Sequence, residues 1–366
     1  MAGSTFGTAF RIMTWGESHG KGVGVTIDGC PAGLPLCEAD IQEYLDRRKP
    51  GQSRYTTARS EGDVVEILSG VFEGQTTGAP IAMMVRNTDQ RSRDYSAIMD
   101  VYRPGHADYC FDAKYGIRDY RGGGRSSARE TIARVAAGAV AAKLLGYYGI
   151  QVTAYTKSIG TVSVEQERFD LAERDKNAFN MPDASAALQA AELMEKMMAA
   201  QDSAGGVVEC RVSGVPAGIG EPVFDKLDAC LAKAVFSIGA VKGFEIGDGF
   251  KAARALGSEN NDPFYMEEDG SVKKRTNHAG GILGGISDGS EIVLRAAFKP
   301  TPSISRQQST VNRNGENVEI SIQGRHDPVV VPRAVVVVEA MTALTVADLL
   351  LQNRNAKLDA AEGSNI

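Results

Sequence analysis

The sequence predicts an α/β fold of the α+β layered type, in which helices lie between two antiparallel sheets in a pseudo-symmetric β-α-β sandwich. Three observations predict it: a strand–turn–helix pattern that occurs twice, at 22–48 and 206–236, a buried-helix pattern at 128–149, and a hydrophobic content of 43% over 366 residues. A chain of this length and composition can build a substantial core. We expect one domain over 1–355 and a frayed tail over 356–366.

The repeated pattern is centred on two Gly-x-Pro-Ala-Gly turns, at 29–33 and 214–218. When the turns are superposed, the apolar residues of the preceding strands also coincide, namely Val23, Val25 and Ile27 with Val208, Cys210 and Val212. Each copy alternates like a half-buried strand, turns, and enters an amphipathic helix. The repeat predicts an internal duplication, although a common turn met twice by chance would give the same match.

The stretch RGGGRSSARET, at 121–131, predicts the start of the buried helix. Ser127 and Glu130 form an S-x-x-E capping box, apolar residues follow at three- and four-residue spacing, and Gly149 is a plausible stop. A glycine loop at a helix N-terminus is suited to holding an anion, and three arginines could converge there: Arg121, Arg125 and Arg129. A capped glycine turn with its arginines in solvent would have the same sequence.

The remaining segments are less regular. Residues 162–203 are charged and helix-like, with an amphipathic run over 184–200, and a last helix is expected from about Arg333 or Val337 to Gln352. Residues 257–276 are polar and are expected to form an irregular surface loop or insertion.

The charge pattern favours a small anionic ligand. The net charge of −6 argues against a nucleic-acid-binding protein. Between Arg47 and Arg134 there are thirteen arginines and two lysines, against twelve and thirteen in the rest of the chain. Guanidinium groups match phosphate and carboxylate geometry, so this bias predicts a shared anion pocket; ordinary ion pairs with the eleven acids of the same span are the alternative.

The cysteines and histidines indicate the compartment and limit the metal chemistry. Five cysteines form no C-x-x-C and no signal peptide precedes them, so a reduced, cytoplasmic location is expected. Neither residue type shows zinc-ligand spacing, and we assign no metal. No uninterrupted apolar run approaches the ~18 residues of a membrane span, so no membrane partner is expected.

Several common catalytic motifs are absent from the sequence. No lysine follows the glycine clusters as a P-loop requires, GKGVGV precedes its strand instead of following it, and GESHG lacks the context of a serine-hydrolase elbow. The four histidines all lie in glycine-rich or turn-like segments, at His19, His106, His278 and His326. A lone histidine is more often structural, yet scaffold-held loops and imidazole both suit proton transfer.

Taken in order along nearly the whole chain, these segments resemble the chorismate synthase family. The segments that support the resemblance are GESHG (16–20), DRRKPGQSRYTT (46–57), SGVFEGQTTGAPI (69–81), TDQRSRDYS (88–96), RPGHADY (103–109), RGGGRSSARET (121–131), SGVPAG (213–218), AVKGFEIGDGF (240–250), NHAGGILGGIS (277–287), FKPTPSI (298–304) and GRHDP (324–328). Motifs this long and numerous are highly specific.

The resemblance implies a reaction and a cofactor. Members convert 5-enolpyruvylshikimate 3-phosphate to chorismate by a 1,4-anti elimination of phosphate, in the last common step of the shikimate pathway to the aromatic amino acids. They require reduced FMN although there is no net redox change. The substrate has one phosphate and two carboxylates, which would account for the arginine bias.

The resemblance also implies the site residues. The FMN contacts would be Arg125, Ser126, Ser127, Gly239, Ala240, Gly284, Lys299, Pro300, Thr301, Pro302, Ser303 and Arg325. Substrate or NADP would be held by Arg48, Arg54, Arg103 and Arg129. His106 would lie near the flavin, His19 would protonate the departing phosphate, and Ser18 and Asp327 would assist proton movement.

The resemblance further implies a homotetramer, and with no evident reductase insertion we expect NADPH to act only indirectly, through a separate flavin reductase. From the residues alone, two other classes stay open: a non-catalytic protein that binds a phosphorylated metabolite, and a nucleotide-dependent transferase using RGGGRSS as its phosphate loop.

Overall fold

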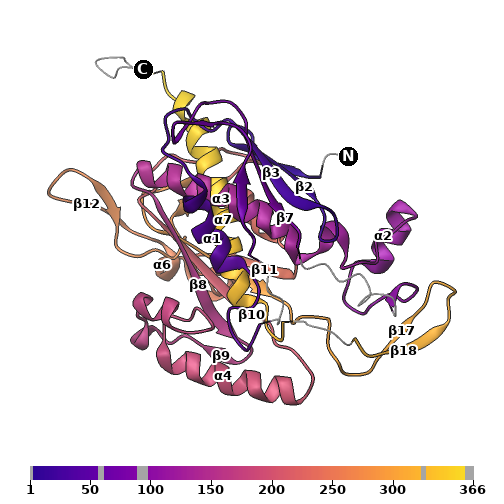
Figure 1. Ribbon diagram of the computed structural model, residues 1–366. Coiled ribbons are helices and arrows are strands. Elements are labelled where there is room, and N and C mark those ends of the chain that lie inside the picture. The colour runs from indigo at the N-terminus through magenta and orange to yellow at the C-terminus, as the bar shows by residue number, and fades with distance from the viewer. Residues whose placement is uncertain (1–2, 57–61, 89–97, 323–326, 359–366) are drawn as a thin grey trace.

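The computed structural model describes residues 3–56, 62–88, 98–322 and 327–358, which form two five-stranded antiparallel sheets with helices between them (Figure 1). The first sheet has the order β1 (Thr5–Phe6), β2 (Arg11–Gly16), β3 (Gly22–Asp28), β7 (Ile81–Arg86), β4 (Val65–Ile67). The second has the order β11 (Val241–Ile246), β16 (Ile292–Phe298), β10 (Gly206–Ser213), β8 (Gln151–Ile159), β9 (Val162–Ser163). The predicted fold class is confirmed.

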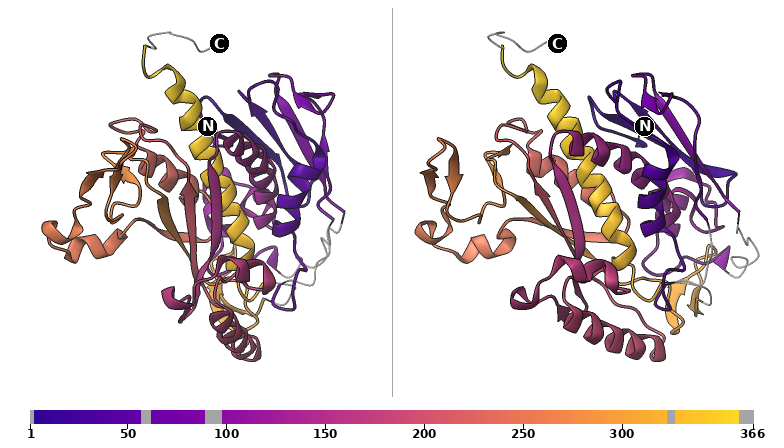
Figure 2. Two further views of the ribbon diagram at one scale, coloured as in Figure 1. Left: turned by 90° about the vertical axis from the view of Figure 1, so that its left-hand side faces the viewer. Right: turned by 60° about the vertical axis from the view of Figure 1, so that its left-hand side comes forward.

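Four helices form the inner layer: α1 (Glu38–Arg48), α3 (Thr131–Tyr147), α5 (Leu227–Phe236) and α7 (Val331–Gln352). α3 packs on β2, β3 and β7, whereas α7 packs on β8 and β10, and the two helices contact each other between the sheets (Figure 2). They approach closely at Gly138, where an added Cβ would lie 2.3 Å from the Cβ of Ala340. Glycine is therefore required at this crossing.

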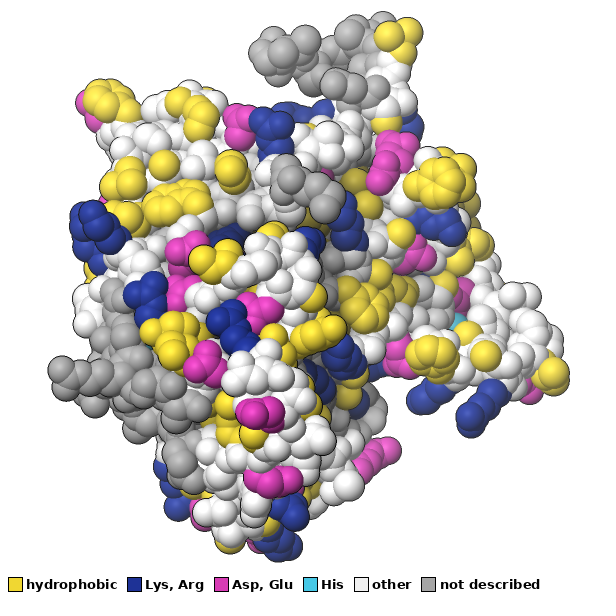
Figure 3. Space-filling view, turned by 90° about the vertical axis from the view of Figure 1, so that its right-hand side faces the viewer, with side chains coloured by type: hydrophobic (Ala, Val, Ile, Leu, Met, Phe, Trp, Pro, Cys, Tyr) yellow, Lys and Arg dark blue, Asp and Glu magenta, His cyan; other side chains and the backbone are white. Residues whose placement is uncertain are grey.

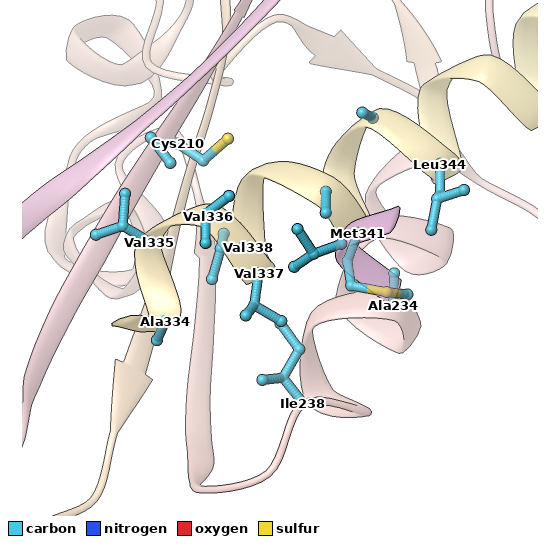
Figure 4. Close-up of a cluster of buried hydrophobic side chains, with 14 of the residues drawn as sticks. Cys210, Ala234, Ile238, Ala334, Val335, Val336, Val337, Val338, Met341 and Leu344 are labelled. Atoms are coloured by element: carbon cyan, nitrogen blue, oxygen red, sulfur yellow. The ribbon is translucent and has the colours of Figure 1, made fainter. Parts of the chain in front are cut away.

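The apolar face of α7 forms much of the core on the side of the second sheet. Figure 4 shows its valines with Cys210 of β10 and with Ala234 and Ile238 of the α5 region. By length and composition α7 could cross a membrane, which the sequence prediction did not foresee. However, 89% of its most apolar window is buried inside the protein, as in the core helix of a soluble protein.

The fold has two halves, the first built on the sheet of β1, β2, β3, β7 and β4 and the second on the sheet of β11, β16, β10, β8 and β9. The turns of the two halves make the same hydrogen bonds. In the first half, Oγ1 of Thr76 accepts from Leu34 N at 2.9 Å and donates to Pro31 O at 2.7 Å. In the second half, Oγ of Ser287 accepts from Ile219 N at 2.9 Å and donates to Pro216 O at 2.6 Å. The hydroxyls lie on equivalent hairpins, β5 (Val71–Phe72) with β6 (Gln75–Thr76), and β14 (Ile282–Leu283) with β15 (Ile286–Ser287).

This match supports the proposed duplication of 22–48 and 206–236, which stays a prediction. The aligned glycines also agree, since Gly29 and Gly214 have φ of 88° and 81° and Gly33 and Gly218 have φ of 87° and 110°. Residues with a side chain rarely adopt such φ values, so glycine is needed at these positions for the backbone of both turns.

Other helix predictions were close, with differences at the ends. α4 (Ala184–Ala199) is the amphipathic helix expected at 184–200, and its N-cap is Asp183. α7 begins at Val331, before both predicted starts, Arg333 and Val337, because Pro332 is compatible with a first helical turn. Of the tail expected over 356–366, residues 359–366 lie outside the described residues.

The capping box predicted at 127–130 was half wrong. Ser127 does accept a hydrogen bond from Arg129 N at 3.3 Å, but a short 3-10 turn over Ala128–Glu130 precedes α3. Glu130 instead forms an ion pair with Arg134 at 2.8 Å, one turn further along the helix. Glu130 therefore pairs with a side chain of the first turn of α3 and does not reach back to cap the helix.

The segment 257–276 lies at the surface, as expected, but the expectation that it is irregular was wrong. The segment contains α6 (Gly257–Asn260) and the hairpin of β12 (Phe264–Met266) and β13 (Val272–Lys274). Lys274, only 1% exposed, lies between Asp262 at 3.2 Å and Asp288 at 2.7 Å. Buried ion pairs stabilise this segment, and such contacts leave no apolar periodicity in the sequence.

A second hairpin, β17 (Gln308–Val311) with β18 (Asn317–Ile320), and a short helix, α2 (Asp108–Tyr115), lie on the other side of the molecule from the β12–β13 hairpin (Figure 1).

Candidate active site

A cavity of about 610 Å³ opens where the N-terminal ends of the two central helices meet. It is lined by Ala128–Thr131, before and at the start of α3, and by Val330, Arg333 and Ala334, at the start of α7. Backbone N–H groups at helix N-termini have no intrahelical partner, and the helix dipole places partial positive charge there. Two long helices therefore direct positive potential toward one space.

The side chains of the cavity add to this positive charge. Of the described residues, seven cationic ones line it, Arg48, Arg103, Arg125, Arg129, Arg134, Lys299 and Arg333, against two acids, Glu130 and Asp327. Five of the seven come from the arginine-rich span of the sequence. On the outer face shown in Figure 3, by contrast, basic and acidic side chains are interspersed. The cavity is thus suited to a ligand with several negative charges.

A buried carboxylate holds two of these arginines. Asp63, whose side chain is 0% exposed, lies 2.9 Å from Nη2 of Arg48 and 3.1 Å from Nη1 of Arg129. Burial together with the charges of Arg333 and Arg129 lowers the pKa of Arg48 to about 10. Arg48 stays charged at neutral pH, and a further anion in the cavity would be favourable beside it.

Other cations are already held by protein groups. Arg103 donates to both carboxylate oxygens of Asp108, at 2.7 and 2.9 Å. The guanidinium of Arg125 donates to β2, including Gly16 O at 3.1 Å and Thr14 Oγ1 at 2.6 Å. Their charge reaches the cavity, while most of their donors are occupied by the protein.

His106 is neutral and fixed from both sides. Its Nδ1 lies 3.0 Å from Pro104 O, and its Nε2 lies 2.9 Å from Oγ of Ser303. A carbonyl can only accept, so Nδ1 carries the proton and Nε2 accepts from the serine. Burial lowers its pKa to about 4, with a further contribution from Arg103 and, after it, Lys299.

Two buried polar atoms are left for a ligand. Within the described part of the chain, neither Nε of Arg48 nor Oγ1 of Thr301 has a hydrogen-bond partner. Thr301 belongs to the Lys299–Ser303 segment, which follows β16 and is fixed by the bond from Lys299 Nζ to Gly105 O at 2.6 Å. Buried polar groups without partners are rare and point to missing ligand contacts.

The comparisons with known proteins agree with this chemistry. A family model described as Chorismate synthase matches residues 10–351. The chain is 67% identical over 359 residues to the chorismate synthase of Lachnospira eligens, covering 98% of each chain, and 57% identical over 362 residues to that of Chloroflexus aggregans, covering 99% of each. A crystal structure of a chorismate synthase superposes with a TM-score of 0.76 at 34% identity, covering 95% of this chain and 94% of that one.

The chain belongs to the chorismate synthase family. Its activity is that of a chorismate synthase, a carbon–oxygen lyase that eliminates phosphate from 5-enolpyruvylshikimate 3-phosphate to give chorismate for aromatic biosynthesis. The alternatives of a non-catalytic phosphometabolite-binding protein and a nucleotide-dependent transferase are thereby set aside.

Most residues to which the resemblance assigned a role lie together. The cavity is lined by Arg48, Arg103, His106, Arg125, Ser126, Ser127, Arg129, Gly239, Ala240, Lys299, Thr301, Pro302, Ser303 and Asp327. Their sequence positions span 280 residues, so the fold, not local sequence, brings them to one place. Arg325 lies outside the described residues.

The other assigned residues lie outside the lining. His19 and Ser18 lie next to Gly122, which does line the cavity, and a Cβ at Gly122 would be 2.4 Å from Cε1 of His19. Pro300 lies within the Lys299–Ser303 segment but is not part of the wall. Gly284 lies in the β14–β15 hairpin, beside the start of α5, whereas the cavity contains the residues that follow the end of α5.

Arg54 lies apart from Arg48. It is exposed, with 71% of its side chain accessible, and forms an ion pair with Glu195 of α4 at 2.7 Å. Arg48, by contrast, is 2% exposed. The two arginines grouped by the resemblance for substrate or NADP therefore face different environments.

Sequence reasoning missed two cationic residues of the cavity. Arg134 is the fourth residue of α3, and Arg333 is the third of α7. Arg134 pairs with Glu130, and Arg333 donates to Asp327 at 2.5 Å and to Arg48 O at 3.2 Å. An arginine in the first turn of a buried, otherwise apolar helix was the available signal, since a charge there must meet a partner or a ligand.

Among the described residues, no cluster of three or more potential metal ligands occurs.

Proposed function

We propose that this cavity binds reduced FMN and 5-enolpyruvylshikimate 3-phosphate side by side, and that the elimination takes place there. The observation that supports this proposal is the meeting of two helix N-termini with seven cationic side chains around one cavity of about 610 Å³. Both ligands carry phosphate, and the substrate adds two carboxylates. The volume lies within the usual range of small-molecule sites.

The residues present fit both ligands. Ser126, Ser127 and the backbone before α3 would hold the FMN phosphate, and Gly239, Ala240, Thr301 and Pro302 would form its other contacts. The unpaired Oγ1 of Thr301 is a suitable partner for a flavin polar atom. Gly284, Pro300 and Arg325 are proposed from the resemblance alone. Reduced FMN, when bound, supplies an electron-rich ring beside the allylic centre that loses phosphate.

Arginines would hold the anionic groups of the substrate. Arg129 and Arg48 share Asp63 and are fixed in place, and Arg103, which pairs with Asp108, adds further positive charge to the lining. Fixed guanidinium groups bind phosphate without reorganising during the reaction, which makes their electrostatic contribution large. Arg54, which is exposed and pairs with Glu195, is proposed to contact substrate or NADP from the resemblance alone.

Proton transfers are assigned to four groups. His19, whose Nδ1 lies 3.1 Å from Oγ of Ser18, would protonate the departing phosphate, and Ser18 would orient its ring. Asp327, held by Arg333 at 2.5 Å, would assist removal of the ring proton. His106 would hold a proton near the flavin in the tautomer that Pro104 and Ser303 determine. A positioned acid of this kind contributes roughly 10²- to 10⁴-fold in rate.

NADPH is proposed to act only as an indirect reductant, through a separate flavin reductase. Arg48 and Arg54 are not combined in one site, since Arg48 is buried at the cavity whereas Arg54 is exposed and pairs with Glu195 of α4. In an anaerobic assay, NADPH with oxidised FMN should give no chorismate, and adding a flavin reductase should restore turnover. Turnover by the pure protein with NADPH would contradict this.

A homotetramer in the cytoplasm is proposed from the resemblance and from the cysteine content. All five cysteines are free thiols, which suits a reducing compartment. Light scattering coupled to size-exclusion chromatography should give four times the chain mass of 38.9 kDa. A monomer or dimer that is fully active would contradict the tetramer as the working form.

The deciding experiment measures chorismate formed anaerobically with chemically reduced FMN. Wild type should turn over, and His19→Ala should lose roughly 10²- to 10⁴-fold in kcat while it keeps substrate affinity. His278→Ala is the matched control, because His278 pairs with Asp248 at 2.8 Å outside the cavity. Equal losses in both variants would contradict the assigned role of His19.

A further inference from the structure

Asn87 joins the turn that contains His19 to the arginines of the cavity. Its Nδ2 donates to two backbone carbonyls, Glu17 O at 2.9 Å and Gly20 O at 2.8 Å. These carbonyls are on the residues immediately before and after Ser18–His19. One side chain therefore closes the Ser18–His19 turn from both ends.

The other end of the same amide faces the arginines. Oδ1 of Asn87 accepts from Nε of Arg129, and Arg129 in turn shares Asp63 with Arg48. The orientation of the amide is determined by its partners, since carbonyls require donors and a guanidinium requires an acceptor. The contacts thus form one continuous path from the turn to the two arginines.

The position of Asn87 in the sheet makes these contacts possible. It follows Arg86, the last residue of β7, and its backbone N donates to Lys21 O at 3.1 Å, which extends the pairing of β7 with β3. The side chain is thereby held at the rigid end of a central strand. A rigid support is what a site needs if two groups must keep a fixed separation.

We propose that Asn87 is a positioning residue for the elimination. It fixes the turn that contains His19 relative to Arg129, so that the proton donor and the phosphate-binding arginine keep one geometry. This inference rests on the proposed role of His19. Small displacements of a donor from its acceptor are costly, because proton transfer requires heavy atoms within about 2.6–3.2 Å, and holding groups in the reactive geometry supplies much of the rate.

The test is Asn87→Asp, which separates the two functions of the amide. A carboxylate keeps the acceptor for Arg129 but cannot donate to Glu17 O or Gly20 O. We expect kcat to fall about 10- to 100-fold with KM changed less than about threefold. Asn87→Ala removes both functions, so KM should rise as well.

Asn177→Asp is the matched control. Nδ2 of Asn177 also donates to two backbone carbonyls, Glu173 O at 2.7 Å and Met181 O at 2.8 Å, away from the cavity. It should lower the melting temperature at least as much as Asn87→Asp does, while kcat and KM stay at wild-type values. If Asn87→Asp keeps wild-type kcat, or raises KM alone, the positioning role is overturned.

A second readout does not depend on activity. In protein labelled at histidine, the ring resonances of His19 should shift in Asn87→Asp and stay in place in Asn177→Asp. Unmoved His19 resonances in both variants would overturn the proposal. If the resonances shift as expected but His19→Ala retains full kcat, the fault lies in the proposed role of His19 and not in the structural link from Asn87.

Discussion

The turns of the two halves make the same hydrogen bonds, whereas the cavity walls that these halves build differ in chemistry. Thr76 and Ser287 connect equivalent carbonyls and N–H groups in the first and second half. Yet, among the described residues, the first half contributes five arginines to the cavity, whereas the second contributes one arginine, one lysine, one aspartate, three hydroxyls and the small residues Gly239 and Ala240.

This difference shows that the scaffold and the site are separable. Both halves direct a helix N-terminus into the cavity, so the backbone contribution is common to them. Most of the positive charge that would bind anions comes from side chains of the first half. The second half mainly offers neutral groups, which would contact the rest of the ligand surface. The predictions below compare the halves, and the one with the largest expected effect comes first.

The largest effect should come from removing charge from the first half. Arg129→Ala should lower kcat/KM about 10²- to 10³-fold, because a buried charged hydrogen bond to a ligand is worth roughly 3–4 kcal/mol. Thr301→Val, in the second half, should cost about tenfold, as expected for a neutral hydrogen bond. Both are measured in the anaerobic assay. Equal losses would contradict the division between a charged and a neutral wall.

The crossing of α3 and α7 connects the halves, and it should be sensitive to one methyl group. Gly138→Ala would place a Cβ 2.3 Å from that of Ala340, and we expect a loss of roughly 1–3 kcal/mol in the free energy of unfolding. Gly146→Ala is the control in the same helix, where a Cβ meets nothing within 4 Å. It should stabilise the protein by about 0.5–1 kcal/mol. Denaturant unfolding distinguishes the two, and equal effects would show that the helices separate readily.

The equivalence of the turns can be tested at their hydroxyls. Thr76→Val and Ser287→Ala each leave a buried N–H and a part-buried carbonyl without their partner, and each should cost about 1–3 kcal/mol in stability. Because the sites lie in separate halves, the double variant should show additive costs within about 0.5 kcal/mol. KM should stay unchanged in all three. A large cost at one hydroxyl and none at the other would mean that the halves are not mechanically equivalent.

The sequence could predict the layers of the fold because local patterns encode them. Alternation around Val25 and Cys210 marked strands, and the apolar spacing after Ala128 marked a buried helix. The order of strands within each sheet was not predictable, since it depends on pairing between distant segments such as β3 with β7 and β10 with β16.

The site was predictable where residues lie in recognisable motifs and unpredictable where a partner is distant. The glycine loop and the Lys299–Ser303 segment gave a signal, but nothing local indicates that Asp63 joins Arg48 to Arg129. The error at 257–276 has the same origin. Lys274 stands in a polar stretch of the sequence that is typical of the surface, whereas in the structure its side chain is buried between Asp262 and Asp288.

The last prediction concerns His106, which residues of both halves contact. Arg103 and Pro104 approach it from the first half, and Ser303 and Lys299 from the second. Its pKa is lowered to about 4 in the folded protein, below the unperturbed value of about 6.5. The unfolded state therefore binds more protons between these pH values, so stability should fall as the pH drops from about 6.5 to 4.

The loss in that window should be on the order of 2–3 kcal/mol, and His106→Gln should remove most of it while leaving stability at pH 7.5 less affected. An anion in the cavity should act oppositely and raise the pKa of His106, because opposite charge favours the imidazolium. Histidine NMR titration with and without inorganic phosphate measures both effects. A pKa near 6.5 in the free protein would mean that the walls do not close around this ring, and an unchanged pKa with phosphate would place the anion elsewhere.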